Sequence, residues 1–251
     1  MKFQIVSDLH LEFNRELKFE DVIEPCAPDL ILAGDIGHII DLDRIKPFLR
    51  KCLSAFRNVV YILGNHEYYR DVKTDTFGRE KTMKELIGML RDFAEKISTK
   101  SHILHIVDKS VIVVGDVCIA GCTLWSKPEV PVPPFIVRIS DMSTSVYNKL
   151  HTGCVRFVNK AIEYAERKKL KLLMIIHYPP VEDLAVRTDK FRSLYSSDLE
   201  HLTKKVHTWV YGHVHKNSDY VNKYGCRLVS NQKGKPKDGA EDFSPAKVIE
   251  I

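Results

Sequence analysis

The sequence predicts an α/β fold in which two mixed β-sheets pack together and helices flank both of them. Short β-rich runs alternate with helical patterns, in the order β-α-β-α-β, an antiparallel group, and then β-α-β-β. No repeat, low-complexity tract or long linker interrupts this order. The 251 residues, of which 44% are hydrophobic, are enough for a sizeable core. We therefore expect residues 1–251 to form a single domain.

The first half is expected to supply three parallel strands and two helices. The strands are residues 2–7, 29–33 and 59–63, and each ends where polar residues and glycine begin. The helices cover residues 42–56 and 78–98, where apolar side chains recur at helical spacing. These helices would connect neighbouring strands of one sheet.

The second half begins with three closely spaced strands at residues 103–107, 111–114 and 118–120, which favours antiparallel pairing around a turn at Gly115 and Asp116. Four prolines (128, 131, 133 and 134) then mark a loop before a long helix at 143–169. The remaining expected elements are a capped helix beginning at Ser196 or Ser197 and strands at 172–176, 208–211, 227–230 and 247–251.

Charge and cysteine usage constrain the function only weakly. A net charge of +5 and a pI near 8.8 permit an anionic substrate or a nucleic-acid partner without requiring either. The first residues do not resemble a secretory signal, and no run approaches the roughly 20 apolar residues of a membrane span. The six cysteines include no C-x-x-C pair and suit buried thiols in a reducing compartment. We expect a soluble, cytoplasmic protein.

Five polar clusters follow predicted strands, where the carboxyl edge of a sheet gathers ligands. Singly, each cluster is more typical of a turn or a structural histidine, and only their joint order predicts a site. Carboxylates, imidazoles and an amide oxygen together suit a pair of divalent ions such as Mn²⁺, Fe²⁺ or Zn²⁺. The clusters are Asp8-x-His10, Gly34-Asp35, Gly64-Asn65-His66-Glu67, His177 and Gly212-His213-x-His215.

This series resembles the calcineurin-like metallophosphoesterase superfamily, whose motifs run D-x-H, G-D-x-x-D, G-N-H-D/E, H and G-H-x-H. The resemblance spans nearly the whole chain and implies a four-layer α/β/β/α sandwich. Three further stretches resemble bacterial and phage-type members. They are Gly121-Cys122-Thr123-Leu124-Trp125, Ser197-Asp198-Leu199-Glu200, and the closing run from Phe243 to Ile251.

The resemblance implies a role for each motif residue. His66 would contact the scissile phosphate and protonate the leaving oxygen, while a hydroxide held between two metal ions would be the nucleophile. Mn²⁺ is favoured, with Fe, Zn, Co and Ni as alternatives. One ion would be held by Asp8, His10, Asp35 and His215, and the other by Asp35, Asn65, His177 and His213.

The chain departs from the family pattern at His38, which stands where the second aspartate of G-D-x-x-D often orients the catalytic histidine. The partner of His66 is therefore open. His38 is either a second phosphate-contacting group, as some nuclease and phosphodiesterase branches suggest, or a solvent-facing loop residue. Protein serine/threonine phosphatases carry arginines where this chain has Ile39, Ile40 and Leu63, which disfavours that branch.

Several other residues have two open interpretations. Glu67 either orients a metal ligand from behind or forms a loop salt bridge, and Tyr68, Tyr69 and Arg70 either line the cleft or pack. Asn231 is expected to close a structural turn. Six basic residues against one acidic residue within 216–237 either follow a phosphate backbone or form a solvated surface. The same choice applies to the candidate substrate contacts Arg138, Arg187, Lys190 and Arg192.

The sequence thus predicts a dinuclear metal-dependent phosphoesterase. Because of His38 and the missing arginines, the prediction leans to phosphodiesters, such as nucleotides or nucleic acids. A phosphomonoesterase is the alternative within the same class. A scaffold that keeps the fold for protein binding is the alternative from another class, and the presence of all ligand types and of His66 argues against it.

Overall fold

The computed structural model describes residues 1–70, 81–184, 189–238, 240 and 242–251. Its first sheet has the order β11-β1-β2-β3-β4, in which β1 to β4 are parallel and β11 is antiparallel to β1. The expected parallel arrangement of the first three strands is confirmed. The strands are β1 (Lys2–Val6), β2 (Asp29–Ala33), β3 (Asn58–Ile62), β4 (Ile103–Val107) and β11 (Val248–Glu250).

The second sheet has the order β5-β6-β7-β8-β10-β9. Its central strands β6, β7, β8 and β10 are parallel, while β5 and β9 pair antiparallel at the two edges. Its strands are β5 (Ser110–Val114), β6 (Val117–Cys122), β7 (Lys171–Ile176), β8 (Thr208–Tyr211), β9 (Asp219–Val221) and β10 (Arg227–Ser230).

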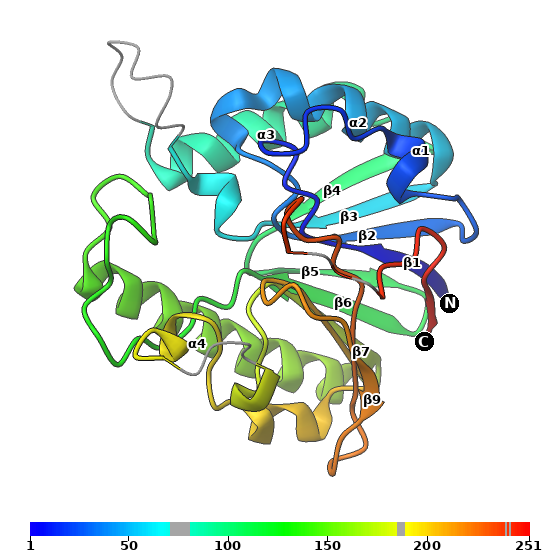
Figure 1. Cartoon of the computed structure of the whole chain (residues 1–251). Coiled ribbons are helices and arrows are strands. Elements are labelled where there is room, and N and C mark those ends of the chain that lie inside the picture. Colours follow the sequence, from blue (N-terminus) through cyan, green and yellow to red (C-terminus); the bar gives the residue numbers. More distant parts are fainter. Residues whose placement is uncertain (71–80, 185–188, 239, 241) are drawn as a thin grey trace.

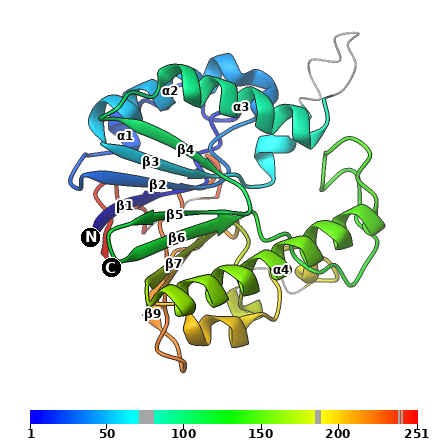
Figure 2. The same cartoon turned by 180° about the vertical axis from the view of Figure 1, so that it is seen from behind.

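Helices cover the outer face of each sheet, so the expected four-layer α/β/β/α fold is confirmed (Figures 1 and 2). Three helices cover the first sheet: α1 (Phe19–Val22), α2 (Leu42–Ala55) and α3 (Met83–Ile97). The long helix α4 (Thr144–Lys168) covers the second. Short 3₁₀ helices lie at η1 (Ile39–Asp41), η2 (His66–Tyr68), η3 (Glu182–Leu184), η4 (Arg192–Leu194) and η5 (Glu200–Lys205).

Buried strands explain why the sequence forms these layers. Successive side chains of a strand point to opposite faces, and both faces of these strands are covered. Ile31 of β2 and Ile175 of β7 belong to the apolar core between the sheets. Leu32 and Ile176, their neighbours, belong to the core beneath the helices. Continuous apolar runs follow from this two-sided burial.

Gly121 on β6 allows the two sheets to approach closely. A Cβ atom at this position would collide with the Ile62 side chain of β3 and lie 2.8 Å from the carbonyl oxygen of Ile175. Neither neighbour can move freely, because both lie inside the core. The absence of a side chain at Gly121 therefore sets the spacing of the sheets near the end where the motif loops meet.

Helix ends follow their capping residues. Ser143 caps α4 by accepting a hydrogen bond from the Val146 amide, and Lys169 ends it in the left-handed conformation with φ of 55°. Thr82 and Glu85 form a capping box at α3. The expected start of this helix at residue 78 lies outside the described residues.

Two expectations about the elements were wrong. Residues 103–107 do not pair antiparallel with the next strand; β4 pairs parallel with β3, and the chain then crosses to the other sheet. No capped helix begins at Ser196 or Ser197. The segment instead forms the 3₁₀ helix η5, and the Ser197 hydroxyl accepts a hydrogen bond from the Lys127 amide 3.0 Å away. Local propensity was overridden by this long-range contact.

The sequence also gave no sign of α1 or β9, which are both short. The turn at Gly115 and Asp116 between β5 and β6 is confirmed, with Gly115 at φ of 59°. Among the described helices, none combines the length and apolar character that a bilayer span requires.

Candidate metal centre

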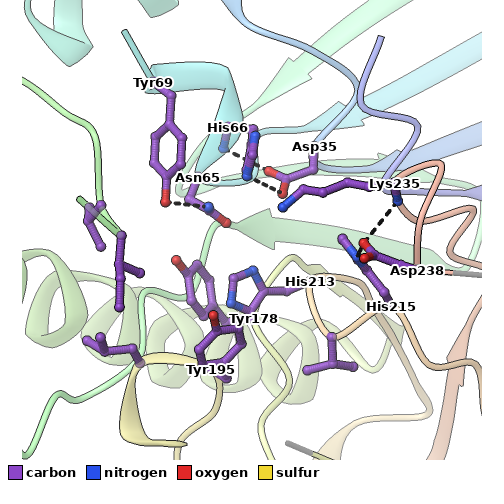
Figure 3. A pocket seen from close by; sticks show the side chains of 14 residues that line it. Asp35, Asn65, His66, Tyr69, Tyr178, Tyr195, His213, His215, Lys235 and Asp238 are labelled. Carbon is purple, nitrogen blue, oxygen red and sulfur yellow. Dashed lines mark hydrogen bonds and ion pairs between the residues drawn. The ribbon is translucent and has the colours of Figure 1, made fainter. Parts of the chain in front are cut away.

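Five loops meet at one end of the stacked sheets, and each follows the carboxyl end of a strand. Loops after β1, β2 and β3 come from the first sheet, and loops after β7 and β8 from the second. All predicted metal ligands lie on these loops and are buried or half-buried. Figure 3 shows part of this site from close by. The residues brought together are Asp8, His10, Asp35, Asn65, His177, His213 and His215.

Asp8, His10 and His215 form one group whose ligand atoms all lie within 4.8 Å of one another. The Nε2 atom of His215 lies 3.3 Å from Oδ1 of Asp8 and 3.0 Å from Nε2 of His10. Two imidazole nitrogens and a carboxylate oxygen thus point at one small volume. Such a donor set could hold a divalent metal ion.

Asp35, His177 and His213 form a second group, again within 4.8 Å. His177 Nε2 lies 3.3 Å from Asp35 Oδ2 and 3.1 Å from the amide oxygen of Asn65. Asp35 Oδ2 also lies 3.8 Å from His10 Nε2 of the first group. Asp35 therefore lies between the groups, where one carboxylate can serve two ions.

Buried negative charge gathers at these loops. The side chains of Asp8, Asp35 and Glu12 are at most 8% exposed, and within the part of the chain that the structure describes their ion-pair partners are histidines, not lysines or arginines. Buried carboxylates without cationic partners are costly. The His213 Nε2 atom is also buried without a hydrogen-bond partner among the described residues. Divalent cations would satisfy both requirements.

The protonation of the site follows from this charge. Burial would lower the pKa of His177, but the carboxylates of Asp35 and Asp8 raise it to about 9. Despite its burial, the pKa of Asp35 is held well below its ordinary value by His177 and His66. The environment of His177 therefore favours a positive charge, which either a proton or a metal ion can provide.

Five of the predicted ligands have a strained backbone. Positive φ angles are uncommon for residues other than glycine and cluster at functional sites. Here the chain must turn sharply after each strand to direct a side chain back over the sheet edge. The five angles are 55° at Asp8, 47° at His10, 53° at Asp35, 75° at His213 and 53° at His215.

The motif glycines leave room for the ligands. A Cβ atom on Gly64 would collide with the Asp35 carboxylate, and one on Gly212 would lie 2.6 Å from Asp8 Oδ2. Ligand side chains therefore pack directly on these glycine backbones. This close approach explains why glycine precedes Asn65 and His213.

Glu67 supports the loop behind the metal ligands. Its carboxylate accepts hydrogen bonds from the backbone amides of Asp35, Ile36 and Gly64 at 2.8–3.0 Å, and from the Tyr61 hydroxyl at 2.7 Å. No salt bridge of Glu67 occurs among the described residues. Of the two open interpretations, the supporting one fits, because these contacts fix the backbone that carries Asp35.

His66 lies beside the ligands with one ring nitrogen toward Asp35. Its Nε2 is 4.0 Å from Asp35 Oδ2, and its Nδ1 is 2.7 Å from Oε1 of Glu12. The His38 ring stacks 5.7 Å away and is buried, so it is not a solvent-facing loop residue. A role for Glu12 was not predicted from the sequence, although Asp8, His10 and Glu12 stand at every second position.

A cleft of about 410 Å³ opens over this centre. Three tyrosines line it: Tyr69, Tyr178 and Tyr195 (Figure 3). The rings of Tyr178 and His213 lie 3.9 Å apart, and the Tyr69 hydroxyl accepts a hydrogen bond from the Asn65 amide at 2.8 Å. Tyr69 thus lines the cleft as one interpretation expected, whereas Tyr68 is buried in the core.

The four basic candidates do not gather in the cleft. Arg138 lies at its edge, with its guanidinium 5.6 Å from the Tyr69 ring. Lys190 and Arg192 are exposed and do not line the cleft, and Arg192 lies 3.5 Å from Asp183. Arg187 falls outside the described residues.

The cation that does line the cleft is Lys235, which was not singled out in the sequence, and Asp238 lies beside it. Both belong to the loop that follows Asn231. As expected, Asn231 closes this region, because its side-chain amide donates hydrogen bonds to the carbonyl oxygens of Ile5 and Ser244, each at 2.8 Å. Asp238 Oδ2 lies 2.6 Å from His215 Nδ1, opposite the nitrogen that faces Asp8.

We expect Asp238→Asn to weaken Mn²⁺ binding by roughly 10- to 100-fold, because carboxylates that orient a ligating histidine have effects of this size. Calorimetric titration of the metal-free protein with Mn²⁺ measures it. Asp242→Asn, which changes an exposed carboxylate of the same loop, is the matched control. Equal affinity for both variants and the wild type would contradict the role of Asp238.

The comparisons with known proteins agree with this geometry. The family model described as calcineurin-like phosphoesterase matches residues 1–217. An uncharacterised protein of Acanthamoeba polyphaga mimivirus is 24% identical over 285 aligned positions, which cover 98% of this chain and 95% of that protein.

Three solved structures are similar in fold. A phosphopantetheinyl hydrolase from Mycobacterium tuberculosis has a TM-score of 0.69 and 19% identity, covering 100% of this chain and 95% of its own. A dimetal phosphatase from Danio rerio has a TM-score of 0.54 and 13% identity, with 98% and 89% covered. A structure from Staphylococcus aureus that is described as a 5'-nucleotidase has a TM-score of 0.50 and 15% identity. The match covers 91% of this chain and 48% of that one.

Proposed function

The chain belongs to the calcineurin-like phosphoesterase family and is a hydrolase of phosphoric esters, and we propose that it cleaves phosphodiesters with the help of two divalent metal ions. The observation that carries this proposal is the convergence of two ligand groups on either side of Asp35. Both groups mix imidazole nitrogens with carboxylate oxygens. Mn²⁺ suits such sites, as do Fe, Zn, Co and Ni.

The residues fit two ions in chemistry as well as in number. Asp8, His10, Asp35 and His215 would hold one, and Asp35, Asn65, His177 and His213 the other. When bound, the ions would supply an activated water and positive charge for the phosphate oxygens. The buried carboxylates support this assignment, as does His213 Nε2, which has no hydrogen-bond partner among the described residues, because a cation would satisfy both.

We assign to His66 the role of proton donor to the leaving oxygen. Its Nδ1 is occupied by Glu12, so its Nε2 is the nitrogen available to substrate, and Nε2 lies 4.0 Å from Asp35 Oδ2. A donor beside the centre can protonate the departing oxygen without contacting the attacking water. His38, stacked on His66, would be a second contact to the phosphate.

The chemistry of the cleft supports a diester. A phosphomonoester dianion needs strong cationic clamps beyond the metals, whereas a diester carries one charge less. Of the residues that line the cleft in the described structure, only Lys235 is a lysine or arginine. Ile39, Ile40 and Leu63, at the positions of the phosphatase arginines, are aliphatic.

The aromatic wall supports a substrate with a planar group, such as a nucleotide or a nucleic-acid end. Tyr69, Tyr178 and Tyr195 line the cleft together with apolar Ile136 and Leu194. Aromatic rings stack on bases without much regard to sequence. The similarity in fold to a 5'-nucleotidase is in keeping with such a substrate. A phosphomonoesterase remains the second candidate, because Lys235 and Arg138 are cations within or beside the cleft.

Hydrolysis of bis(p-nitrophenyl) phosphate and of p-nitrophenyl phosphate at matched Mn²⁺ concentrations tests the proposal. We expect a higher kcat/KM for the diester, and a higher value for the monoester would overturn the diester assignment. Absence of hydrolysis with any metal of a Mn²⁺, Fe²⁺, Zn²⁺, Co²⁺ and Ni²⁺ series would instead favour the scaffold. A nucleotide panel run alongside identifies the preferred group.

We also propose that the enzyme works in the cytoplasm. Five of the six cysteines are buried free thiols: Cys52, Cys118, Cys122, Cys154 and Cys226. Such thiols are typical of proteins from reducing compartments.

A further inference from the structure

One carboxylate oxygen joins three histidines of the site. Oε1 of Glu12 lies 2.7 Å from His66 Nδ1, 3.0 Å from His10 Nδ1 and 3.5 Å from His38 Nε2. Only 8% of the Glu12 side chain is exposed. Glu12 comes from the loop after β1, not from the loop after β2 where the family pattern puts its orienting aspartate and this chain has His38.

We propose that Glu12 is the positioning residue of His66, replacing the carboxylate that position 38 does not supply. The inference rests on the proposed function, since it assigns a partner to the proton donor of that reaction. An ionised carboxylate accepts hydrogen bonds and cannot donate them, so His66 must carry a proton on Nδ1. Nε2 is then the nitrogen that exchanges a proton with the substrate.

This arrangement gives a balanced proton transfer. The bond between phosphorus and the leaving oxygen breaks, and that oxygen keeps the bonding pair and takes a proton from His66 Nε2. A water oxygen forms the new bond to phosphorus and releases its own proton to solvent. His66 is left neutral, with its Nδ1 proton still donated to Glu12.

Packing also holds the His66 ring in the orientation that its contact with Glu12 requires. The Tyr69 ring lies 4.5 Å away on one side, and His10 meets the ring edge-on at 4.4 Å. Because Glu12 also contacts His10 Nδ1, it links the proton donor to a metal ligand. Loss of Glu12 could therefore act through the metal alone, and the test must separate the two effects.

The test compares diphenyl phosphate, with a poor leaving group, and bis(p-nitrophenyl) phosphate, with a good one. We expect Glu12→Ala to lower kcat for diphenyl phosphate by about 10- to 100-fold, less than the roughly 10²- to 10⁴-fold contribution of the general acid itself, and to lower it much less for the nitrophenyl ester. KM should stay nearly constant. Glu12→Gln, whose amide oxygen can still accept one hydrogen bond, should retain more activity than Glu12→Ala.

Two controls separate positioning from metal loss and from general destabilisation. Metal content is measured at saturating Mn²⁺, and Glu16→Gln changes an exposed carboxylate of the same loop. In a double-mutant cycle, Glu12→Ala should add almost nothing to His66→Ala, because both remove the same proton donor. Equal losses for the two esters, or additive losses in the cycle, would overturn the proposal.

A spectroscopic measurement decides the proposal even without activity. In the Zn²⁺-loaded protein, the His66 Nδ1 proton should give a protected NMR signal that disappears in Glu12→Ala. Persistence of that signal would refute the role of Glu12. If the wild type hydrolysed no phosphoester, the proposed function would fail, while this signal would still show whether Glu12 positions His66.

Discussion

Replacement of Asp35 by asparagine is expected to lower kcat/KM on the order of 10³-fold or more, since metal charge stabilisation supplies several kcal/mol. Among the described ligands, Asp35 is the carboxylate that lies between the two groups, with Oδ2 3.3 Å from His177 Nε2 and 3.8 Å from His10 Nε2. Asparagine keeps the shape of the side chain but lacks the charge. The loss should therefore come from the metals and not from the fold.

Thermal unfolding with and without Mn²⁺ measures the metal binding on which this loss of kcat/KM depends. The wild type should gain stability as Mn²⁺ exceeds its dissociation constant, while Asp35→Asn should gain little. Asp116→Asn, in the exposed turn between β5 and β6, is the matched control and should behave like the wild type. Two tightly bound ions per chain in Asp35→Asn would argue that Asp35 does not join the two sites.

The second large effect is expected for His66→Ala, which should lower kcat for diphenyl phosphate by about 10²- to 10⁴-fold. The reason is the loss of the proton donor, because His66 directs Nε2 toward Asp35 and is assigned to neither of the two proposed ions, although His10, Glu12 and His66 also lie close enough together to hold one. Bound metal should remain. For bis(p-nitrophenyl) phosphate, whose leaving group needs little protonation, the loss should be much smaller.

Steady-state kinetics with both esters, together with metal analysis, checks this expectation. His201→Ala, at an exposed histidine of η5 outside the motif loops, serves as the control. Unchanged hydrolysis of both esters by His66→Ala would show that His66 is not the proton donor.

The sequence predicted the strands that carry the motifs because they are buried on both faces. Runs such as 30–33 and 172–176 are apolar throughout and stop at a polar residue or glycine, so both the burial of the strand and its end can be predicted. Their parallel order then brings Asp8, Asp35 and His177 to one edge. The gathering of the predicted ligands follows from this rule alone.

Features decided by long-range contacts could not be predicted in the same way. Only two residues separate strand β4 from β5, but β4 joins the other sheet, since its register with β3 buries Leu104 and Val107. Glu12 and Asp238 act through hydrogen bonds to His66 and His215, distant in sequence by 54 and 23 residues. The spacing of residues along the chain does not predict such partners.

The left-handed backbone at five ligand positions has a consequence for how such a chain can change. Each of these conformations costs roughly 1–3 kcal/mol for a side chain other than glycine. The fold therefore gives up stability at the residues on which its chemistry depends. Descendants released from catalysis should drift toward glycine or asparagine there, and the ligand-bearing ancestor should be the less robust molecule.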